Sequence, residues 1–196
     1  PRVELDFMCR RSLIEYLDEE PIIDRPDLIR LVMNADSAEF VPDFPPERLR
    51  QIRRKLEEVT VVDPACGSGA FLVGMMQVLS GLHRLICERL GEPYHDFQVK
   101  KRIIGENLFG VDIKDWAVRV AELRLWLSLI IQASLDEVQE DPAKPILPNL
   151  TFRIQVGDSL VEEIAGRSLS LRGRYSQMDD AVRRQMVGEG QHHRRI

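Results

Sequence analysis

The stretch from Val59 to Gly74 reads Val-Thr-Val-Val-Asp-Pro-Ala-Cys-Gly-Ser-Gly-Ala-Phe-Leu-Val-Gly. Its first four residues are β-branched, mostly valine, and such a run predicts a strand that is buried on both faces. Asp63 and Pro64 end that strand, a glycine-rich loop follows, and the apolar residues from Ala70 onward have helical spacing. This order of strand, acid, glycine loop and helix is typical of the first crossover in a nucleotide-binding α/β domain.

The loop between this strand and helix favours a ligand without phosphate. Gly67 and Gly69 allow the backbone to approach a ligand closely, and the helix that follows presents unpaired N–H groups. In dinucleotide-binding folds these groups face a pyrophosphate. Here Asp63 ends the strand, and its carboxylate repels phosphate but suits a cationic or hydroxyl-rich ligand. S-adenosylmethionine fits, because it carries a sulfonium, an ammonium and ribose hydroxyls.

Two other classes of glycine loop fit the sequence less well. A dehydrogenase fingerprint requires a third glycine or alanine where Leu72 stands. A phosphate-binding loop requires Gly-Lys-Ser or Gly-Lys-Thr, and the 196 residues contain no such run. The loop chemistry therefore favours S-adenosylmethionine over a dinucleotide or a nucleoside triphosphate.

Two further segments place an acid at or just after the end of a predicted strand. Residues 107–113 read Asn-Leu-Phe-Gly-Val-Asp-Ile, which predicts a second buried strand ending in Asp112. A carboxylate in this position can accept hydrogen bonds from both ribose hydroxyls. Asp112 could instead favour the dipole of the next helix, although Asp115 is better placed for that role. Residues 150–156 alternate as a third strand, and Gly-Asp-Ser-Leu follows at 157–160.

The run from Asp63 to Leu72 resembles motif I of the adenine-N6 DNA methyltransferases of restriction–modification systems, in the branch whose methylase and nuclease share one chain. The segment from Asp112 to Val118 resembles motif II of that family, and the run around Asp158 resembles motif III. The resemblance covers residues 59–160. It implies an α/β, Rossmann-like methyltransferase fold that is present only in part, as strands one to three, and S-adenosylmethionine as the cofactor.

The resemblance also implies which residues hold the cofactor. Asp112 would bind the ribose, Asp158 would accept a hydrogen bond from the adenine amine, and Ile113 would form an apolar floor under the adenine. The complete predicted cofactor site consists of Asp63, Pro64, Ala65, Gly67, Gly69, Phe71, Asp112, Ile113, Asp158 and Ser159. Double-stranded DNA is the implied partner, bound mostly by parts of a longer parent protein.

Methyl transfer to adenine N6 requires a further motif in this family, Asn/Asp-Pro-Pro-Tyr/Phe after the fourth strand. Its side chain and a backbone carbonyl accept the two amine hydrogens, and its aromatic ring stacks on a flipped-out base. The 196 residues contain no such motif, and the nearest run, Phe44-Pro45-Pro46-Glu47, precedes motif I and lacks the aromatic residue. No catalytic residue can be named, and we expect the chain alone to be inactive.

Other functions stay open at this point. The chain could be a non-catalytic module that docks on DNA or on a partner. It could also belong to a methyltransferase that shares these turns but acts on glutamine side chains of proteins or on RNA. Gly-Asp-Ser-Leu also occurs in esterases that use the serine as nucleophile, but those proteins carry it near the chain start, so we do not expect this role for Ser159.

Composition limits the possible environment and partners. The net charge is −5, so the chain as a whole is not a basic nucleic-acid-binding protein. Its three cysteines are widely spaced and have no metal-ligand spacing, which predicts a reducing, cytoplasmic location and no metal site. We found no signal peptide and predict no contact with a membrane. Because the chain starts at Pro1 without an initiator methionine, we expect it to be a piece of a longer protein.

The chain divides into three predicted segments: a helical segment at 1–58, the cofactor-binding half of the methyltransferase domain at 59–165, and a basic helical insertion or tail at 166–196. Helices are expected at 2–17, 27–34, 46–58, from 70 to about 90, and from 115 to about 134. The last of these is so apolar that we expect burial on more than one side, with Trp126 in the core. Pro1 could be the proline of a family motif near the cofactor, or an ordinary helix start.

Overall fold

The computed structural model describes residues 2–35, 42–131, 148–150, 152–161, 163–164 and 167–168. The chain forms two compact units, Pro1–Gly157 and Asp158–Ile196. The predictions made for Pro1 and for residues 169–196 lie outside the described residues.

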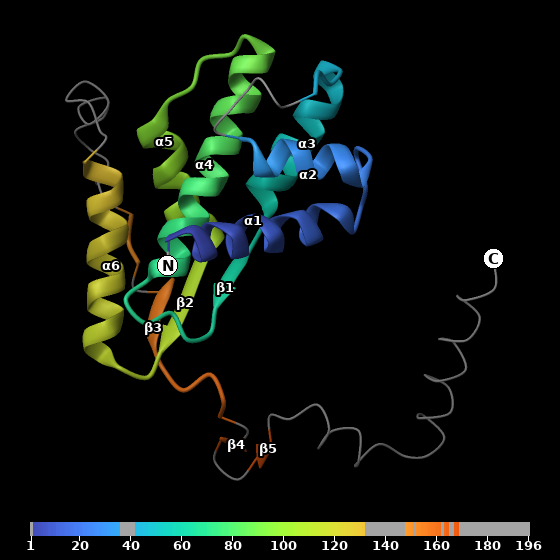
Figure 1. Cartoon of the computed structure of the whole chain (residues 1–196). Coiled ribbons are helices and arrows are strands. Elements are labelled where there is room, and N and C mark those ends of the chain that lie inside the picture. The colour runs from blue at the N-terminus through green and yellow to red at the C-terminus, as the bar shows by residue number, and fades with distance from the viewer. Residues whose placement is uncertain are drawn as a thin grey trace, which may run out of the picture. The chain divides into compact units, whose positions relative to one another are not determined.

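A small parallel sheet packs against α4 and α6 in the first unit (Figure 1). Its strands are β1 (Val61–Asp63), β2 (Leu108–Asp112) and β3 (Ile154–Val156), in the order β1-β2-β3. Parallel neighbours require long crossovers. The first crossover contains α4 (Ala70–Leu90), α5 (Asp96–Arg102) and a π-helical turn, η2 (Ile103–Asn107), and the second contains α6 (Asp115–Ile130). The α/β class and the three strands are therefore confirmed.

The first strand differs from its prediction in position and in burial. It begins at Val61, because Val59 still caps the preceding helix through a hydrogen bond from its N–H to the carbonyl of Lys55. Val61, Leu108 and Ile154 are buried on the face that the helices cover. Val62 points to the other face and is 59% exposed, so the prediction that the strand is buried on both faces was wrong. Side chains alternate along a strand, and helices among the described residues cover only one of the two faces.

The third strand is also shorter than predicted. The N–H groups of Arg153 and Ile154 both donate to the carbonyl of Leu150, at 2.8 and 3.0 Å. These bonds form a turn where the alternating sequence predicted extended backbone. Apolar alternation over so few residues does not distinguish a strand from a compact turn with one buried leucine.

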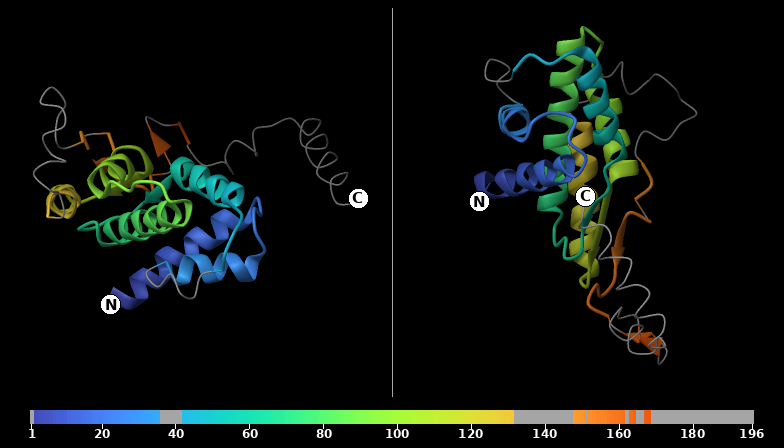
Figure 2. Two further views of the ribbon diagram at one scale, coloured as in Figure 1. Left: turned by 90° about the horizontal axis from the view of Figure 1, so that it is seen from above. Right: turned by 90° about the vertical axis from the view of Figure 1, so that its right-hand side faces the viewer.

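The helical segment before the sheet consists of α1 (Arg2–Asp18), α2 (Arg25–Met33) and α3 (Pro46–Glu58), close to the predicted ranges. Figure 2 shows α1 and α2 side by side, with α1 crossing α4. Basic side chains of α3 form ion pairs, because Arg53 pairs with Glu92 and Lys55 with Glu20. This segment packs onto α4 and belongs to the same compact unit as the sheet.

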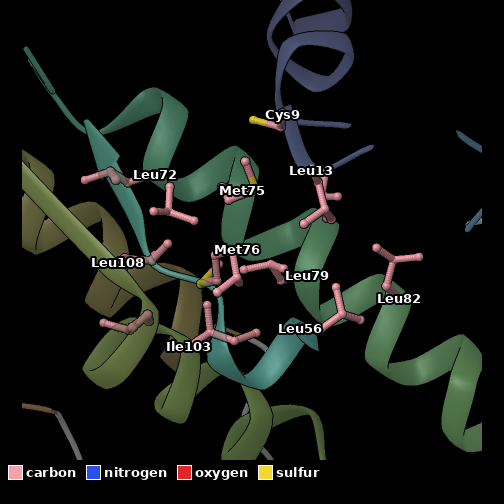
Figure 3. Packing of buried hydrophobic residues seen from close by; sticks show 14 of the residues in the cluster. Cys9, Leu13, Leu56, Leu72, Met75, Met76, Leu79, Leu82, Ile103 and Leu108 are labelled. Carbon is pink, nitrogen blue, oxygen red and sulfur yellow. The ribbon is translucent and has the colours of Figure 1, made fainter. Parts of the chain in front are cut away.

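Helix α4 forms the axis of the hydrophobic core. Its apolar side chains pack against α1, α3 and the sheet, as Figure 3 shows. The labelled members of this cluster are Cys9, Leu13, Leu56, Leu72, Met75, Met76, Leu79, Leu82, Ile103 and Leu108. By length and composition alone α4 could cross a membrane, a property that the sequence analysis missed. However, 67% of its apolar window is buried in the protein, and the core helix of a globular protein meets the same criteria.

Helix α6 is buried on one side only, so the prediction of burial on more than one side was wrong. Ala117, Ala121, Leu125 and Leu129 face the protein. The opposite side exposes a row of apolar residues at helical spacing: Trp116, Val120, Leu123, Leu127 and Ile130. Trp126 is partly buried against the core, as predicted, and its Nε1 donates to the carbonyl of Pro148 at 3.4 Å.

In the second unit, β4 (Glu163–Ile164) and β5 (Arg167–Ser168) pair antiparallel as a hairpin whose strands have two residues each. The sequence analysis did not predict this hairpin. Strands of two residues carry too short a pattern for any period to be recognised.

Candidate functional site

The acids that end the first two strands lie at the same edge of the sheet. Asp63 is the last residue of β1 and pairs in register with Gly110 of β2, two residues before Asp112. Because the strands are parallel and adjacent, their carboxyl ends open at one edge, where ligands of α/β folds bind. Both carboxylates are partly exposed there.

The glycine loop is folded over the end of β2 by backbone hydrogen bonds. The N–H of Cys66 donates to the carbonyl of Val111 at 2.9 Å, and the N–H of Gly67 donates to Oδ2 of Asp112 at 2.8 Å. Within the loop, the N–H of Gly69 donates to the carbonyl of Cys66 at 2.8 Å. Motif I and motif II are therefore joined directly, with Asp112 as the side chain that connects them.

Two backbone N–H groups hold the carboxylate of Asp112. Its Oδ1 accepts the N–H of Lys114 at 2.9 Å and its Oδ2 accepts the N–H of Gly67. These two bonds, the Lys114 bond first, hold the pKa of Asp112 below its usual value, so the side chain is ionised at neutral pH. Each carboxylate oxygen has two lone-pair sites, and the hydrogen bonds among the described residues use one on each oxygen.

The other predicted residues of motif I occupy different environments. Oδ1 of Asp63 accepts the N–H of Ala65 at 3.2 Å, which orients the carboxylate at the start of the loop. Pro64 and Ala65 are exposed. Phe71 is partly buried and packs against the core. Ile113 is 63% exposed, an unusual setting for isoleucine and one that suits an apolar ligand surface.

The helix that follows the loop begins without a side-chain cap. Gly69 is the N-terminal cap of α4 in the left-handed conformation, with φ of +75°, and it has no side chain to bond the first N–H groups. The 21-residue α4 therefore opens with free backbone donors beside the loop. On the α1 side of this first turn lies a pocket of about 530 Å³, bordered by Leu5, Asp6, Val73 and Arg124.

The cysteine inside motif I is not a nucleophile. Burial raises the pKa of the Cys66 thiol to about 11, and the nearby carboxylates of Asp63 and Asp112 act in the same direction. The thiol is therefore neutral at physiological pH. Its neighbour on the sheet is Gly110, where a Cβ would approach the Cys66 side chain to 3.1 Å. The role of Cys66 is to pack the loop onto β2.

The third acid, Asp158, is the first residue of the second unit. It is exposed, and its Oδ1 accepts the N–H of Leu160 at 2.9 Å, while Ser159 is also exposed. In the first unit, Val156 pairs with Asp112 and the N–H of Gly157 donates to the carbonyl of Asp112 at 2.9 Å. Contact of Asp158 and Ser159 with the same ligand stays a prediction.

Two residues that support the loop were missed by the sequence analysis. Nη1 of Arg124, on α6, donates to both the carbonyl and the Oγ of Ser68, each at 3.0 Å. Ala121, one turn earlier on α6, lies directly against Gly69. Neither belongs to a recognisable motif, and 56 residues separate Arg124 from Ser68, so no local pattern predicted the contact.

The first two strands of the parallel sheet end in an acid, and the glycine loop is bonded to the second of these acids. This arrangement is typical of nucleoside-binding α/β proteins. Among the described residues, no group of three or more histidine, cysteine or acidic side chains could hold a metal ion. The chain belongs to the family of the MmeI DNA-methyltransferase domain, whose family model matches residues 37–164. The resemblance to restriction–modification methyltransferases is thereby confirmed.

Curated relatives agree with this family. The chain is 37% identical over 113 residues to a putative type II restriction enzyme and methyltransferase of Methanocaldococcus jannaschii, covering 58% of this chain and 9% of the relative. It is 30% identical over 81 residues to DNA methyltransferase A of Bacillus subtilis, covering 41% of this chain and 9% of the relative. It is 32% identical over 109 residues to the adenine-specific methyltransferase PglX of Streptomyces coelicolor, covering 54% and 8%.

The matched regions span less than a tenth of the length of each of these relatives. No solved structure matches the chain significantly.

Proposed function

We propose that this chain is the cofactor-binding part of an S-adenosylmethionine-dependent DNA methyltransferase that modifies adenine N6 in a restriction–modification or related defence system. The observation that carries the proposal is the bond from the Gly67 N–H to the Asp112 carboxylate, which joins motif I to motif II at one edge of the sheet. The descriptions of the family and of DNA methyltransferase A support DNA as the substrate, and the name of PglX supports adenine as the base. The cytoplasmic location stays a prediction.

Each end of the cofactor would meet a group of matching chemistry within a partial Rossmann-like fold. The other lone-pair site on each oxygen of Asp112 would accept a ribose hydroxyl, and the exposed side chain of Ile113 would lie under the adenine. The uncapped N–H groups at the start of α4 would favour the carboxylate of the methionine end. Asp63 would face the positive charges of the ligand, and Asp158 would accept a bond from the adenine amine.

The cofactor supplies an activated methyl group, and this chain holds and orients it. The acceptors for the two hydrogens of the adenine amine are absent from the 196 residues, because no Asn/Asp-Pro-Pro-Tyr/Phe run occurs. We therefore assign cofactor binding to this chain and the direct in-line transfer to a larger parent protein. The parent protein would also provide the main contacts with double-stranded DNA.

Isothermal titration calorimetry of the chain with S-adenosylmethionine tests the binding role. We expect binding by the wild-type chain and a loss of about 100-fold in affinity for Asp112→Ala, because two hydrogen bonds to a charged group disappear. Asp115→Ala is the matched control, since this acid begins α6 and, among the residues that the structure describes, its ion pair is with Arg119 of its own helix at 3.6 Å. Equal affinity of Asp112→Ala and the wild type would refute the site.

The acceptor of the methyl group is tested on the protein encoded by the complete parent gene. We expect transfer of tritium from labelled S-adenosylmethionine to DNA, with N6-methyladenine in the digested nucleosides by mass spectrometry. Label in protein glutamine or in RNA would identify one of the alternative methyltransferases. A folded chain that binds no S-adenosylmethionine would instead support a docking module and contradict the proposal.

A further inference from the structure

The structure assigns a positioning role to Arg124: this residue of α6 holds the glycine loop in the shape that receives S-adenosylmethionine. The identity of the ligand rests on the proposed function, whereas the effect of Arg124 on the loop does not. The inference goes beyond the family motifs, because Arg124 lies outside all three of them.

Hydrogen bonds join the loop to two other elements, β2 and α6. Cys66 and Gly67 are bonded to β2, and Gly69 is bonded back to Cys66. Ser68 lies between them, and the bonds that the structure shows to its carbonyl and hydroxyl both come from the Arg124 guanidinium, at 3.0 Å. Within the described part of the chain, β2 therefore holds Cys66 and Gly67, and α6 holds Ser68.

Steric contact between α6 and the loop supports the same role independently. A Cβ placed on Gly69 would lie 2.9 Å from the Cβ and 3.1 Å from the Cα of Ala121, whose own side chain is fully buried. Ala121 and Arg124 are three residues apart and share one face of the helix. Ala121 sets the distance between α6 and the loop, and Arg124 then reaches over the loop to Ser68.

The two glycines of the loop make its order depend on contacts such as the bonds from Arg124. Ser68 is flanked by Gly67 and Gly69, both with positive φ, at +51° and +75°. Glycine has more accessible backbone conformations than any other residue, so a loop with two of them is ordered only by its contacts. If the bonds to Ser68 are lost, ligand binding must order this residue, and we expect a loss of about tenfold in affinity.

The test compares Arg124→Met with Arg119→Met, because methionine retains most of the aliphatic stem. Arg119 is an exposed arginine on the same helix, and its ion pairs among the described residues are with Asp115 and Glu122 of α6. Arg124→Met should raise the Kd for S-adenosylmethionine about tenfold in calorimetry, and Arg119→Met should leave it unchanged. Arg124→Lys should recover part of the affinity, since an ammonium can still donate to Ser68.

Amide hydrogen exchange of the ligand-free chain gives a readout that does not depend on the cofactor. In Arg124→Met the amides of Gly67 and Gly69 should exchange faster, while the amides of Leu125 and Leu129 in α6 keep their protection. Unchanged exchange at both glycines overturns the inference, whether or not the cofactor binds. A raised Kd with unchanged exchange also overturns it, because Arg124 would then contact the ligand directly. A wild-type chain that binds no cofactor but shows the expected exchange contradicts only the proposed function.

Discussion

At the scale of single residues, Gly69 and Gly91 occupy the two ends of α4 in similar backbone conformations but in different surroundings. Gly69 has φ of +75° and Gly91 has φ of +67°, so an L-residue is strained at either position. A Cβ on Gly91 would meet no atom within 4 Å, whereas a Cβ on Gly69 would collide with Ala121 of α6. Substitutions at the two glycines therefore distinguish the cost of backbone strain alone from the cost of strain plus close packing.

We predict that Gly91→Ala lowers the free energy of unfolding by about 1 kcal/mol, which is the strain of the left-handed conformation less the gain from a stiffer unfolded chain. Gly69→Ala should cost about 2–4 kcal/mol, because overpacking against Ala121 is added to the strain. Urea denaturation followed by circular dichroism measures both values. Equal costs for the two variants would show that α6 does not press on the loop.

The environment of Asp112 could be predicted only in part from its motif. Its place at the end of a strand followed from the apolar run before it. Its two bonds to backbone N–H groups did not, because one donor is Gly67, 45 residues earlier in the chain. The two residues are too far apart in the sequence for a local pattern to predict this contact. It forms because β1 and β2 pair in parallel.

At the scale of elements, α6 shows why apolar composition is a poor measure of burial. Its second half is almost continuously apolar, yet Leu125 is fully buried and Leu123, two residues earlier, is 52% exposed. Two residues on a helix are about 200° apart and face nearly opposite sides. The sequence predicts the helix, and only the position of the sheet decides which side is covered.

The two leucines provide a test of this arrangement. Leu125→Ala should lower the free energy of unfolding by about 3 kcal/mol, because it removes a buried side chain and leaves a cavity. Leu123→Ala should cost less than about 1 kcal/mol, since its side chain already contacts water. Thermal and urea denaturation of the two variants should therefore differ clearly. Similar large losses would mean that the exposed side of α6 is covered in solution.

At the scale of the whole molecule, the buried side chain of His83 on α4 makes stability depend on pH. It is 2% exposed, and its Nε2 has no hydrogen-bond partner among the described residues. Burial first, and then the positive charges of Arg102 and Arg53, lower the pKa of His83 to about 4 against the opposing effect of Glu57. The protein therefore holds this histidine in its neutral form over most of the acidic range.

The depressed pKa makes the stability of the chain depend on pH in a defined window. Below about pH 6.5 the unfolded chain binds a proton at His83 and the folded chain does not, so stability falls until about pH 4. The loss from this group amounts to about 3 kcal/mol. His83→Gln should flatten the dependence between these two pH values, as measured by urea denaturation at several pH values.

His95→Gln is the matched control for this measurement, because it makes the same substitution at an exposed histidine that precedes α5. If His83→Gln shows the same slope as the wild type, protonation of His83 does not limit the stability of the fold. Acid sensitivity would then arise from carboxylates such as Asp112, whose lowered pKa stabilises the fold above about pH 4 and loses this effect as pH falls further.

The sequence by itself determined the α/β class, the helices before and after the glycine loop, and the acids that end the first two strands. These features depend on contiguous residues, whose periodicity and turn chemistry act locally. The tertiary structure alone decided which face of the sheet and of α6 is covered, the bond from Gly67 to Asp112, and the contacts of Arg124 and Ala121 with the loop. These contacts join residues that are far apart in the chain, and they exist only after the strands have paired and α6 has packed beside them.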